Sequence, residues 1–440
     1  MTNAPAHAPD SAFLIGGPNH LEAGPVDGKA VLTAARQLAD FGRANSSWAF
    51  IRAPEIIAAA AQQFLAPSSP IREAALKAAT GLGMSRPMAA EALDNFFPRL
   101  TSPALISFRD AELAVAAGRS IVPAAMIFHV LAGNLFLSGI ESIVLGSLVG
   151  SCNFVRSSSE DRVFPTLWLE ALKSTDAAFA QTIVVGWWPA ELADLTRAAA
   201  GEADVVVGYG SNESIAEIQK CVPPSGRFVA HGARISFAVV TAESLARDTA
   251  KQVAAELAYD FSVYDQAGCL SPRAALIQDG GAVSPAEFGE MLVAEMRQVN
   301  ESLPRAELSL EDASAMARQR DEILIEASTH GGAQVLSCHG DPFLVSLRTV
   351  QGYVPGGLNR HGDLRVFRRL KDLEELLLRF RGCVSTVGYA GPEGECDFLF
   401  RMARVSRVCR LGQMQKPPLG WTHDGRASLL DLVDLLDVEK

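Results

Sequence analysis

A possible nucleophile stands in the sequence YDQAGCLSP, which spans residues 264–272. Two small residues precede Cys269 and leave room around its thiol, and a Ser-Pro pair predicts a turn directly after it. A free cysteine is most often a small buried hydrophobic residue, so this loop alone does not establish a role. A cysteine is also highly nucleophilic near neutral pH. The loop therefore makes Cys269 a candidate nucleophile that the rest of the sequence has to support.

The number and spacing of the cysteines indicate whether that thiol is free. The chain has seven, at scattered positions and without a Cys-x-x-Cys pair. This pattern argues against a disulfide framework and against a zinc site, so we expect no metal. The first nine residues lack the basic start and apolar block of a secretion signal. We therefore expect a cytoplasmic protein in which Cys269 stays reduced and the other six cysteines fill the interior.

Charge and hydropathy exclude two kinds of partner. A net charge of -11 opposes a nucleic-acid-binding surface, which needs a basic face. Residues 121–140 carry no charge and reach the ~20 residues that a membrane-spanning helix needs. A proline and two glycines interrupt them, however, and His129 and Asn134 would need partners inside lipid. We assign this stretch to the core, as a strand, a loop and the start of a helix, and expect no integral membrane segment.

The elements that would position a site alternate along the chain. In the part from 121 to 231, short apolar runs and amphipathic stretches predict βαβ units around a parallel sheet. The expected strands are 125–133, 152–156, 182–188 and 204–210, and the expected helices are 139–150, 161–175, 189–200 and 212–220. Parallel sheets bind ligands at the carboxyl ends of their strands. Asn134, Arg156 and the Tyr209-Gly210-Ser211 turn should lie at such ends.

A second alternation begins after residue 231. It predicts another α/β domain over 232–410, with strands at 234–240, 274–278 and 364–370 and helices at 242–259, 285–303 and 310–326. Residues 1–120 are mainly helical and interrupted by prolines, and we group them with the first sheet. Residues 411–440 form a C-terminal segment that packs back or serves in oligomerisation. A chain of 440 residues agrees with more than one domain.

Several motifs carry a family resemblance in their order. They are HVLAGNLFLSGIESIVLGSLVGSCNFVRSSSED, YGSNESI, HGARISFAVV, YDQAGCLSP and GQMQKPPLGWTHDG. Together they resemble the acyl-CoA reductases of the LuxC type, within the aldehyde dehydrogenase superfamily, over roughly residues 120 to 430. The resemblance implies an aldehyde-dehydrogenase-like α/β fold: a Rossmann-like cofactor domain over 121–231, a catalytic domain over 232–410 and a small oligomerisation element. It also implies a homo-oligomer.

The resemblance assigns roles to three residues. Asn134 lies 22 residues before Arg156 and 135 before Cys269, close to the superfamily's spacing of asparagine, cofactor-side lysine and nucleophilic cysteine. By this match Cys269 is the nucleophile, Asn134 donates to the oxyanion, and Arg156 stands where the lysine meets the adenosine ribose. An asparagine amide and a backbone N–H can together hold the oxyanion of a tetrahedral species.

One departure from the superfamily indicates the direction of the reaction. Members that oxidise aldehydes carry a glutamate that activates water before a Gly-Gly-Lys. This chain has VAHGARIS there, with Ala230 or His231 at the glutamate's position. An enzyme that must keep its acyl-cysteine from water benefits from lacking that base. His231 and His423 are the candidates for proton transfer, although each would more often be structural, and the task of Trp421 to Gly425 stays open.

The cofactor is predicted from the residues after Arg156. Relatives that oxidise aldehydes place a glutamate three positions after the lysine, against the ribose hydroxyls, and here that position holds Ser159. A serine beside a fixed arginine charge would accept a 2′-phosphate, so we expect NADPH in preference to NADH, although Glu160 follows directly. Further cofactor-binding candidates are Ser157 and Ser158, which could cap a helix facing phosphate, and Gly210 with Ser211 in a glycine turn.

The sequence therefore predicts reduction of an acyl thioester to an aldehyde. The acyl donor could be CoA, a carrier protein or an acyl-protein synthetase partner, and the sequence does not fix the acyl chain. Two alternatives stay open. One is a non-acylating aldehyde dehydrogenase, which the missing glutamate disfavours, and the other is an acyl-accepting scaffold subunit without hydride transfer.

Overall fold

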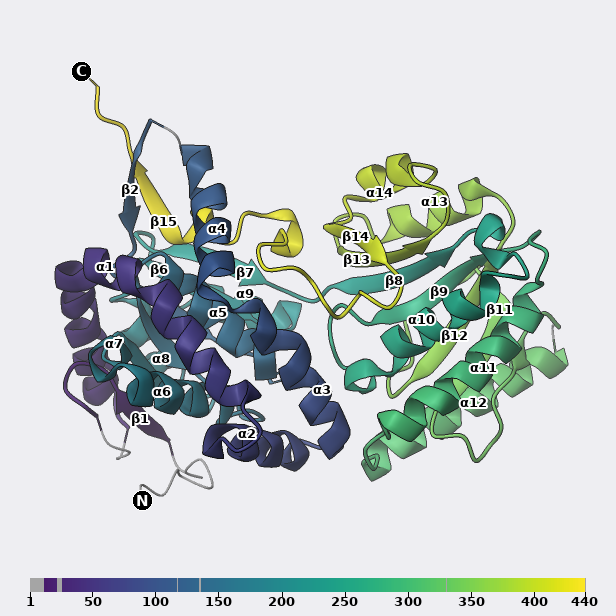
Figure 1. Cartoon of the computed structure of the whole chain (residues 1–440), viewed down its shortest axis with the longest axis horizontal. Coiled ribbons are helices and arrows are strands. Elements are labelled where there is room, and N and C mark those ends of the chain that lie inside the picture. Colours follow the sequence, from purple (N-terminus) through teal and green to yellow (C-terminus); the bar gives the residue numbers. More distant parts are fainter. Residues whose placement is uncertain (1–11, 22–25, 117, 134–135, 330, 440) are drawn as a thin grey trace.

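Two largely parallel sheets, one in each of two lobes, form the framework of the structure (Figure 1). The computed structural model describes residues 12–21, 26–116, 118–133, 136–329 and 331–439. The first lobe contains the N-terminal helices and the first sheet, and the second contains the chain from β8 to β14. The C-terminal segment runs back from the second lobe to the first.

The first sheet has six strands in the order β1-β5-β4-β3-β6-β7. Its strands are β1 (Phe13–Gly16), β3 (Met126–Val130), β4 (Cys152–Arg156), β5 (Ile183–Trp187), β6 (Val205–Tyr209) and β7 (Arg227–His231). All pair in parallel except β1, which is antiparallel to β5. Every residue of β3 and β5 is buried, as expected for strands covered on both faces. The predicted parallel sheet is confirmed.

Helices cover this sheet and fill most of the first 120 residues. They are α1 (Gly28–Leu65), α2 (Pro70–Gly81), α3 (Arg86–Phe96), α4 (Ser102–Leu113), α5 (Phe136–Leu148), α6 (Phe164–Thr175), α7 (Ala177–Ala180), α8 (Ala193–Ala200) and α9 (Asn212–Gln219). The prolines of α2, α3 and α4 stand in their first turns. A first-turn proline costs no helical hydrogen bond, so these prolines separate helices rather than break them.

The second sheet has the order β10-β11-β12-β9-β8-β13-β14. Its strands are β8 (Ile235–Val240), β9 (Pro272–Gln278), β10 (Gln334–Val335), β11 (Leu344–Thr349), β12 (His361–Phe367), β13 (Val384–Ala390) and β14 (Arg407–Arg410). The helices are α10 (Ala250–Ser262), α11 (Pro285–Ser302), α12 (Leu310–Thr329), α13 (Leu370–Arg379) and α14 (Asp397–Ala403). Separate clusters of buried apolar side chains lie on the two faces of this sheet. Each lobe thus has its own core.

The C-terminal segment joins the lobes. After β14 it passes the junction between them and ends in β15 (Val433–Leu436), which pairs antiparallel with β2 (Ser120–Pro123) (Figure 1). Arg227 of β7 donates hydrogen bonds to the carbonyl oxygens of Asp431 and Val433, at 3.0 and 2.8 Å. These contacts fix the end of the segment to the first lobe.

Most of the uncharged stretch from 121 to 140 lies in the core, as predicted, but β2 at its start is half-exposed, with Val122 44% exposed. It contains β2, β3 and the beginning of α5, and residues 134 and 135 lie outside the described residues. His129 is fully buried, with Nδ1 2.7 Å from Ser142 Oγ and Nε2 3.0 Å from Asn153 Oδ1. Within the described residues, none of the helices has the length and apolar character needed to cross a membrane.

Two expectations are wrong. The helix expected over 242–259 begins only at Ala250, because Ala246 is extended and the carbonyl of Leu245 accepts a hydrogen bond from Val283 N at 2.8 Å. The six other cysteines do not all fill the interior, since Cys338 and Cys383 are exposed.

Candidate active site

Cys269 lies at the junction of the two lobes, in the loop between α10 and β9. Ser236 Oγ of β8 donates to its carbonyl oxygen at 2.8 Å. A cavity of about 80 Å³ opens beside it. Its walls come from both lobes and from the C-terminal segment, and the other lining residues are Asn95, Phe96, Arg99, Leu137, Ser138, Glu141, Tyr264, Leu270, Gln415, Pro417, Trp421 and His423. Most of the cavity surface is apolar, which suits an acyl group.

The surroundings of Cys269 keep its thiol protonated near neutral pH. The residue is exposed toward the cavity, but the cavity walls desolvate the sulfur and raise the pKa of the thiol to about 11. The carboxylates of Asp424 and Glu141 add to this rise because they repel a thiolate. The thiol therefore needs a proton acceptor before it can attack a substrate.

Four rings form a continuous stack beside the cavity. Tyr209 at the end of β6 stacks on His231 at the end of β7, with ring centroids 4.6 Å apart. His231 stacks on His423 at 4.4 Å, and His423 lies against Trp421 at 4.7 Å. Burial, followed by the adjacent His231, lowers the pKa of His423 to about 4. His423 is therefore a neutral imidazole near neutral pH and lines the same cavity as Cys269.

Asp424 holds this stack in place. Its side chain is only 1% exposed, and Oδ2 accepts a hydrogen bond from His231 Nδ1 at 2.8 Å. Its Oδ1 lies 2.9 Å from Arg234 Nε, in the link between the lobes. Burial alone would raise the pKa of Asp424, but the bond from His231 and the adjacent His423 and Arg234 lower it. An ionised Asp424 fixes the tautomer of His231, with the proton on Nδ1.

The same three residues lie close enough to hold a metal ion, since ligand atoms of His231, His423 and Asp424 fall within 4.8 Å of one another. The two imidazole planes are, however, within 19° of parallel. Their lone pairs lie in the ring planes and so do not converge on one point, and Arg234 places a positive charge beside Asp424. This geometry suits proton transfer better than metal coordination.

A second, larger cavity lies along the carboxyl ends of β3, β4 and β6. It has a volume of about 610 Å³. The predicted cofactor residues that line it are Arg156, Ser158, Ser159, Gly210 and Ser211. Tyr209 lines this groove and also stacks on His231, so the groove adjoins the site around Cys269. Carboxyl ends of parallel strands are where such sheets bind nucleotides.

Arg156 has the chemistry to meet an anion in this groove. Its guanidinium lies 5.7 Å from the ring centroid of Trp188 and donates through Nη2 to the Trp188 carbonyl at 3.0 Å. Its buried Nε has no hydrogen-bond partner, and the guanidinium makes no ion pair with any described carboxylate. A partly unsatisfied arginine in a groove fits phosphate or ribose oxygens.

The serines differ in their positions. Ser157 is buried and does not line the groove. Ser158 Oγ accepts a hydrogen bond from Asp161 N at 2.8 Å, but Asp161, rather than either serine, accepts bonds from the start of α6. Ser211 caps α9 by accepting from Ser214 N at 3.2 Å. The expected helix cap at Ser157 and Ser158 is therefore wrong, and Ser211, which was expected in a glycine turn, caps a helix at the groove instead.

Glu160 is exposed, but it lines the groove and its side chain lies against the backbone of Gly133. A Cβ atom on Gly133 would come within 2.5 Å of the Glu160 carboxylate and within 2.8 Å of Ser158 Oγ. Gly133 thus lets the chain pass closely over these two side chains at the end of β3. The groove contains a carboxylate as well as the Arg156 cation, and both bear on the choice between NADPH and NADH.

The predicted residue Asn134 lies outside the described residues. Two residues of the site, Asp424 and Gln415, were not predicted. Gln415 packs on Gly268, with its amide atoms 3.0 Å from the position that a Cβ of Gly268 would take, and it lines the cavity of Cys269. Both lie in the motif GQMQKPPLGWTHDG, which was the signal for them in the sequence.

The chain is similar to known proteins over most of its length. The family model described as acyl-CoA reductase (LuxC) matches residues 104–435. A long-chain acyl-protein thioester reductase from Aliivibrio fischeri is 23% identical over 72% of this chain. The chain spans 64% of the length of that relative.

Two solved structures share the fold at low sequence identity. Aldehyde dehydrogenase 21 from Physcomitrella patens superposes with a TM-score of 0.68 at 12% identity, over 98% of this chain and 95% of that one. The NADP-dependent glyceraldehyde-3-phosphate dehydrogenase from Bacillus halodurans gives 0.68 at 13%, over 97% and 95%. The predicted aldehyde-dehydrogenase-like fold is confirmed.

Proposed function

Because this chain belongs to the LuxC family of acyl-CoA reductases, we propose that it reduces an acyl thioester to an aldehyde. The reaction passes through an acyl-cysteine on Cys269, with NADPH as the hydride donor. One observation carries the proposal: Cys269 and the neutral imidazole of His423 line one cavity, next to a groove suited to a dinucleotide. A thiol that needs deprotonation, a base and a cofactor groove thus meet at the junction of the lobes.

The first step transfers the acyl group to the enzyme. The Cys269 sulfur attacks the thioester carbonyl, and the bond from the carbonyl carbon to the donor sulfur breaks. His423 accepts the Cys269 proton and passes it to the departing thiolate. The proton moves from one sulfur to another, so no thiolate has to persist at a site that raises the thiol pKa. The nearby Asp424 carboxylate stabilises the transient imidazolium.

The second step forms the aldehyde. A nicotinamide cofactor held in the groove would supply the hydride for the acyl carbon. The carbon–sulfur bond then breaks, and the Cys269 thiolate leaves and regains a proton through His423. Arg156, the Ser211 end of α9 and the groove around them would hold the phosphates and ribose. The unpartnered Arg156 Nε and the close passage at Gly133 support this fit.

The residues around the acyl-cysteine favour reduction over hydrolysis. At the end of β7, where aldehyde-oxidising enzymes carry the glutamate that activates water, this chain has His231, whose Nδ1–H is bonded to Asp424. Glu141 of α5 lines the cavity from another direction. The fate of the acyl group therefore has to be measured as aldehyde against acid, and we expect aldehyde.

The test uses a panel of thioesters. The protein is incubated with NADPH and acyl-CoAs of increasing chain length, an acyl-carrier protein and, because the A. fischeri relative is named for acyl-protein thioesters, an S-acylated protein. Loss of NADPH absorbance with one trapped aldehyde per cofactor supports the proposal. If no donor leads to cofactor oxidation while Cys269 still becomes acylated, the result favours an acyl-accepting scaffold subunit without hydride transfer.

We propose Asn134 as an oxyanion donor, on the family match. Asn134→Ala should lower turnover by about 10²–10³-fold, the usual loss for one such donor, because the tetrahedral species loses a hydrogen bond. Cofactor affinity, measured by fluorescence, should change little and serves as the control. An unchanged turnover number assigns Asn134 a structural role instead.

The preference for NADPH is proposed to depend on Arg156. A guanidinium pairs with phosphate through two N–H groups and stays charged near pH 7, so Arg156→Ala should weaken NADPH by at least tenfold more than NADH. Dissociation constants for both cofactors, from fluorescence titration, test this. Arg197→Ala is the matched control, because Arg197 lines the same groove but is paired with Asp194.

Glu160→Gln tests whether the carboxylate in the groove opposes binding of the 2′-phosphate. If the Glu160 carboxylate faces the ribose, removing its charge should improve NADPH binding and leave NADH binding unchanged or weaker. Equal losses for both cofactors in Arg156→Ala, or a wild-type preference for NADH, would overturn the NADPH assignment.

The homo-oligomer predicted from the family stays a prediction, which sedimentation velocity can check.

A further inference from the structure

The residues just before Cys269 adopt an unusual backbone. Tyr264, Asp265 and Gln266 have φ values of 57°, 49° and 66°, so three consecutive non-glycine residues are left-handed. Side chains disfavour this conformation, because Cβ crowds the following carbonyl. Such a turn persists only where the surrounding structure holds it in place, and such turns cluster at functional sites. The contacts that hold this one identify further residues that serve the site.

Gln266 fixes the turn from inside the second lobe. Its side chain is fully buried. Its Nε2 donates to the carbonyl oxygens of Pro272 and His361, at 2.8 and 3.0 Å, and its Oε1 accepts from His361 N at 2.8 Å. One amide therefore joins the two ends of the Cys269 loop to the first residue of β12. Gln266 does not line the cavity, so it touches neither the thiol's partners nor an acyl group.

An ion pair fixes the middle residue of the turn. Asp265 Oδ1 accepts from Arg360 Nε at 2.6 Å, and the side chain of Arg360 is fully buried. The remaining donors of Arg360 bond Asn300 Oδ1 at 3.0 Å and the Leu303 carbonyl at 2.8 Å, at the end of α11. Every nitrogen of this guanidinium thus has a partner, and its position is fixed from three directions.

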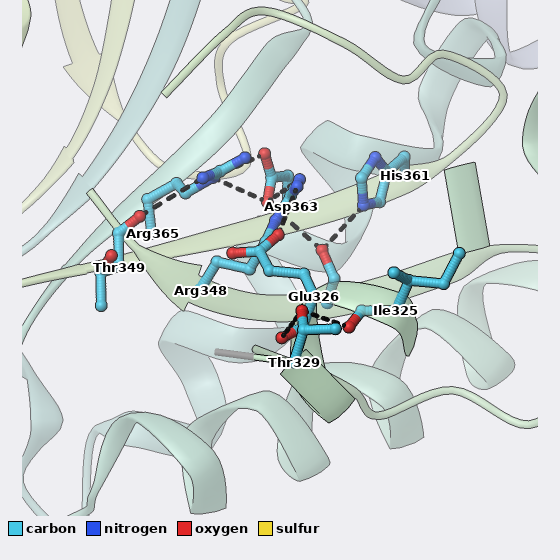
Figure 2. Close-up of polar contacts among 9 residues, drawn as sticks. Ile325, Glu326, Thr329, Arg348, Thr349, His361, Asp363 and Arg365 are labelled. Carbon is cyan, nitrogen blue, oxygen red and sulfur yellow. Dashed lines mark hydrogen bonds and ion pairs between the residues drawn. The ribbon is translucent and has the colours of Figure 1, made fainter. Parts of the chain in front are cut away.

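The strand that carries these anchors is itself held by a buried polar cluster (Figure 2). His361 Nε2 lies 2.9 Å from Ser346 Oγ, which donates to Asp363 Oδ1 at 3.2 Å. Asp363 also forms ion pairs with Arg348, at 3.0 Å, and Arg365, at 2.9 Å. This network restrains β12, because Ser346 Oγ has two partners in it and Asp363 has three, although His361 Nδ1 and Arg348 Nε have none.

We propose that Gln266 and the Asp265–Arg360 ion pair are positioning residues for the Cys269 thiol. They force the left-handed turn that directs both Tyr264 and Cys269 into the cavity, and β12 serves as their rigid support. This inference rests on the proposed function, in which Cys269 is the nucleophile. It adds that the nucleophile's position is set by buried residues of the second lobe that contact no substrate.

The test compares two glutamines that bond backbone carbonyls. Gln266→Met keeps the shape of the side chain but removes three hydrogen bonds. Gln63→Met is the control, since Gln63 Nε2 donates to the Ala171 carbonyl at 3.0 Å in the first lobe, away from Cys269. Acyl transfer is followed without cofactor, as the burst of p-nitrophenolate from p-nitrophenyl acetate, and aldehyde formation is followed with the best thioester.

A displaced thiol should slow acyl transfer without changing binding. At a temperature where both variants are folded, we expect Gln266→Met to lower the burst rate and kcat by about 10- to 100-fold, with KM and cofactor dissociation constants within threefold of wild type. Gln63→Met should keep the wild-type rates. Gln266→Glu should retain more activity than Gln266→Met, because a carboxyl held protonated between two carbonyls still donates one hydrogen bond and accepts another.

The outcomes separate this inference from the proposed function. If Gln266→Met loses thermal stability but keeps its burst rate and kcat within threefold, Gln266 is only structural and the inference is wrong. If Cys269→Ala retains the burst, the nucleophile is misassigned and the proposed function fails. If the wild type shows the burst but no aldehyde, hydride transfer fails, and the burst rates of the two variants still decide the positioning role.

Discussion

Cys269→Ala is expected to abolish aldehyde formation and to remove the covalent acyl label from the protein. Both steps of the proposed reaction run through the Cys269 sulfur: it receives the acyl group, and it leaves when the aldehyde forms. No other described side chain in the cavity is a comparable nucleophile, since the remaining lining groups are two amides, two hydroxyls, an imidazole, an indole, one carboxylate, one guanidinium and apolar side chains. We expect no aldehyde above background.

Intact-protein and peptide mass spectrometry after incubation with an acyl thioester locates the label. Cys338→Ala is the matched control, because Cys338 is also exposed but lies on the far part of the second lobe, beside α11 and β11, and should keep wild-type activity. An acyl adduct on another cysteine in the wild type, or aldehyde production by Cys269→Ala, would contradict the assignment.

His423→Ala is expected to lower the acylation rate by about 10²–10⁴-fold at neutral pH, the usual contribution of a positioned base. The wild-type rate should vary little between pH 5 and 9, because His423 is neutral above its pKa of about 4 and the thiol stays protonated below its pKa of about 11. Without the imidazole only the thiolate reacts. The variant's rate should therefore rise roughly tenfold per pH unit toward the thiol pKa.

Stopped-flow acylation from pH 5 to 9 measures both profiles. His339→Ala is the control, since His339 is exposed in the second lobe and should leave the profile flat. A His423→Ala profile as flat as that of the wild type would exclude His423 as the proton acceptor. His231→Ala then becomes the informative variant, because its ring is the next in the stack.

The sheets were predictable where apolar runs are continuous. The strands that became β3, β4, β5 and β6 stand out because strands buried on both faces need an apolar residue at nearly every position. The stretch from 242 to 249 misled because it has helical composition. Its conformation is decided by Leu245, whose carbonyl bonds Val283 from another part of the chain, and no local pattern records that contact.

The candidate site could be proposed residue by residue but not as an assembly. Cys269, Arg156 and the histidines could be singled out from their types and spacing. Their relations could not, because His231 and its partner Asp424 are 193 residues apart. The anchors of the nucleophile turn were equally hidden, since Gln266 and His361 lie 95 residues apart and look unremarkable in the sequence.

The return of the C-terminal segment to the first lobe has a consequence for synthesis of the chain. His423 and Asp424 follow both sheets in the sequence, and β15 follows them. During translation, both sheets can form before His423 reaches Cys269, but the core of the first lobe is completed late, because Leu429, Leu432 and Val433 belong to it. Under the proposed function, the site is complete only when β15 docks on β2 and the segment before it carries the histidine into place.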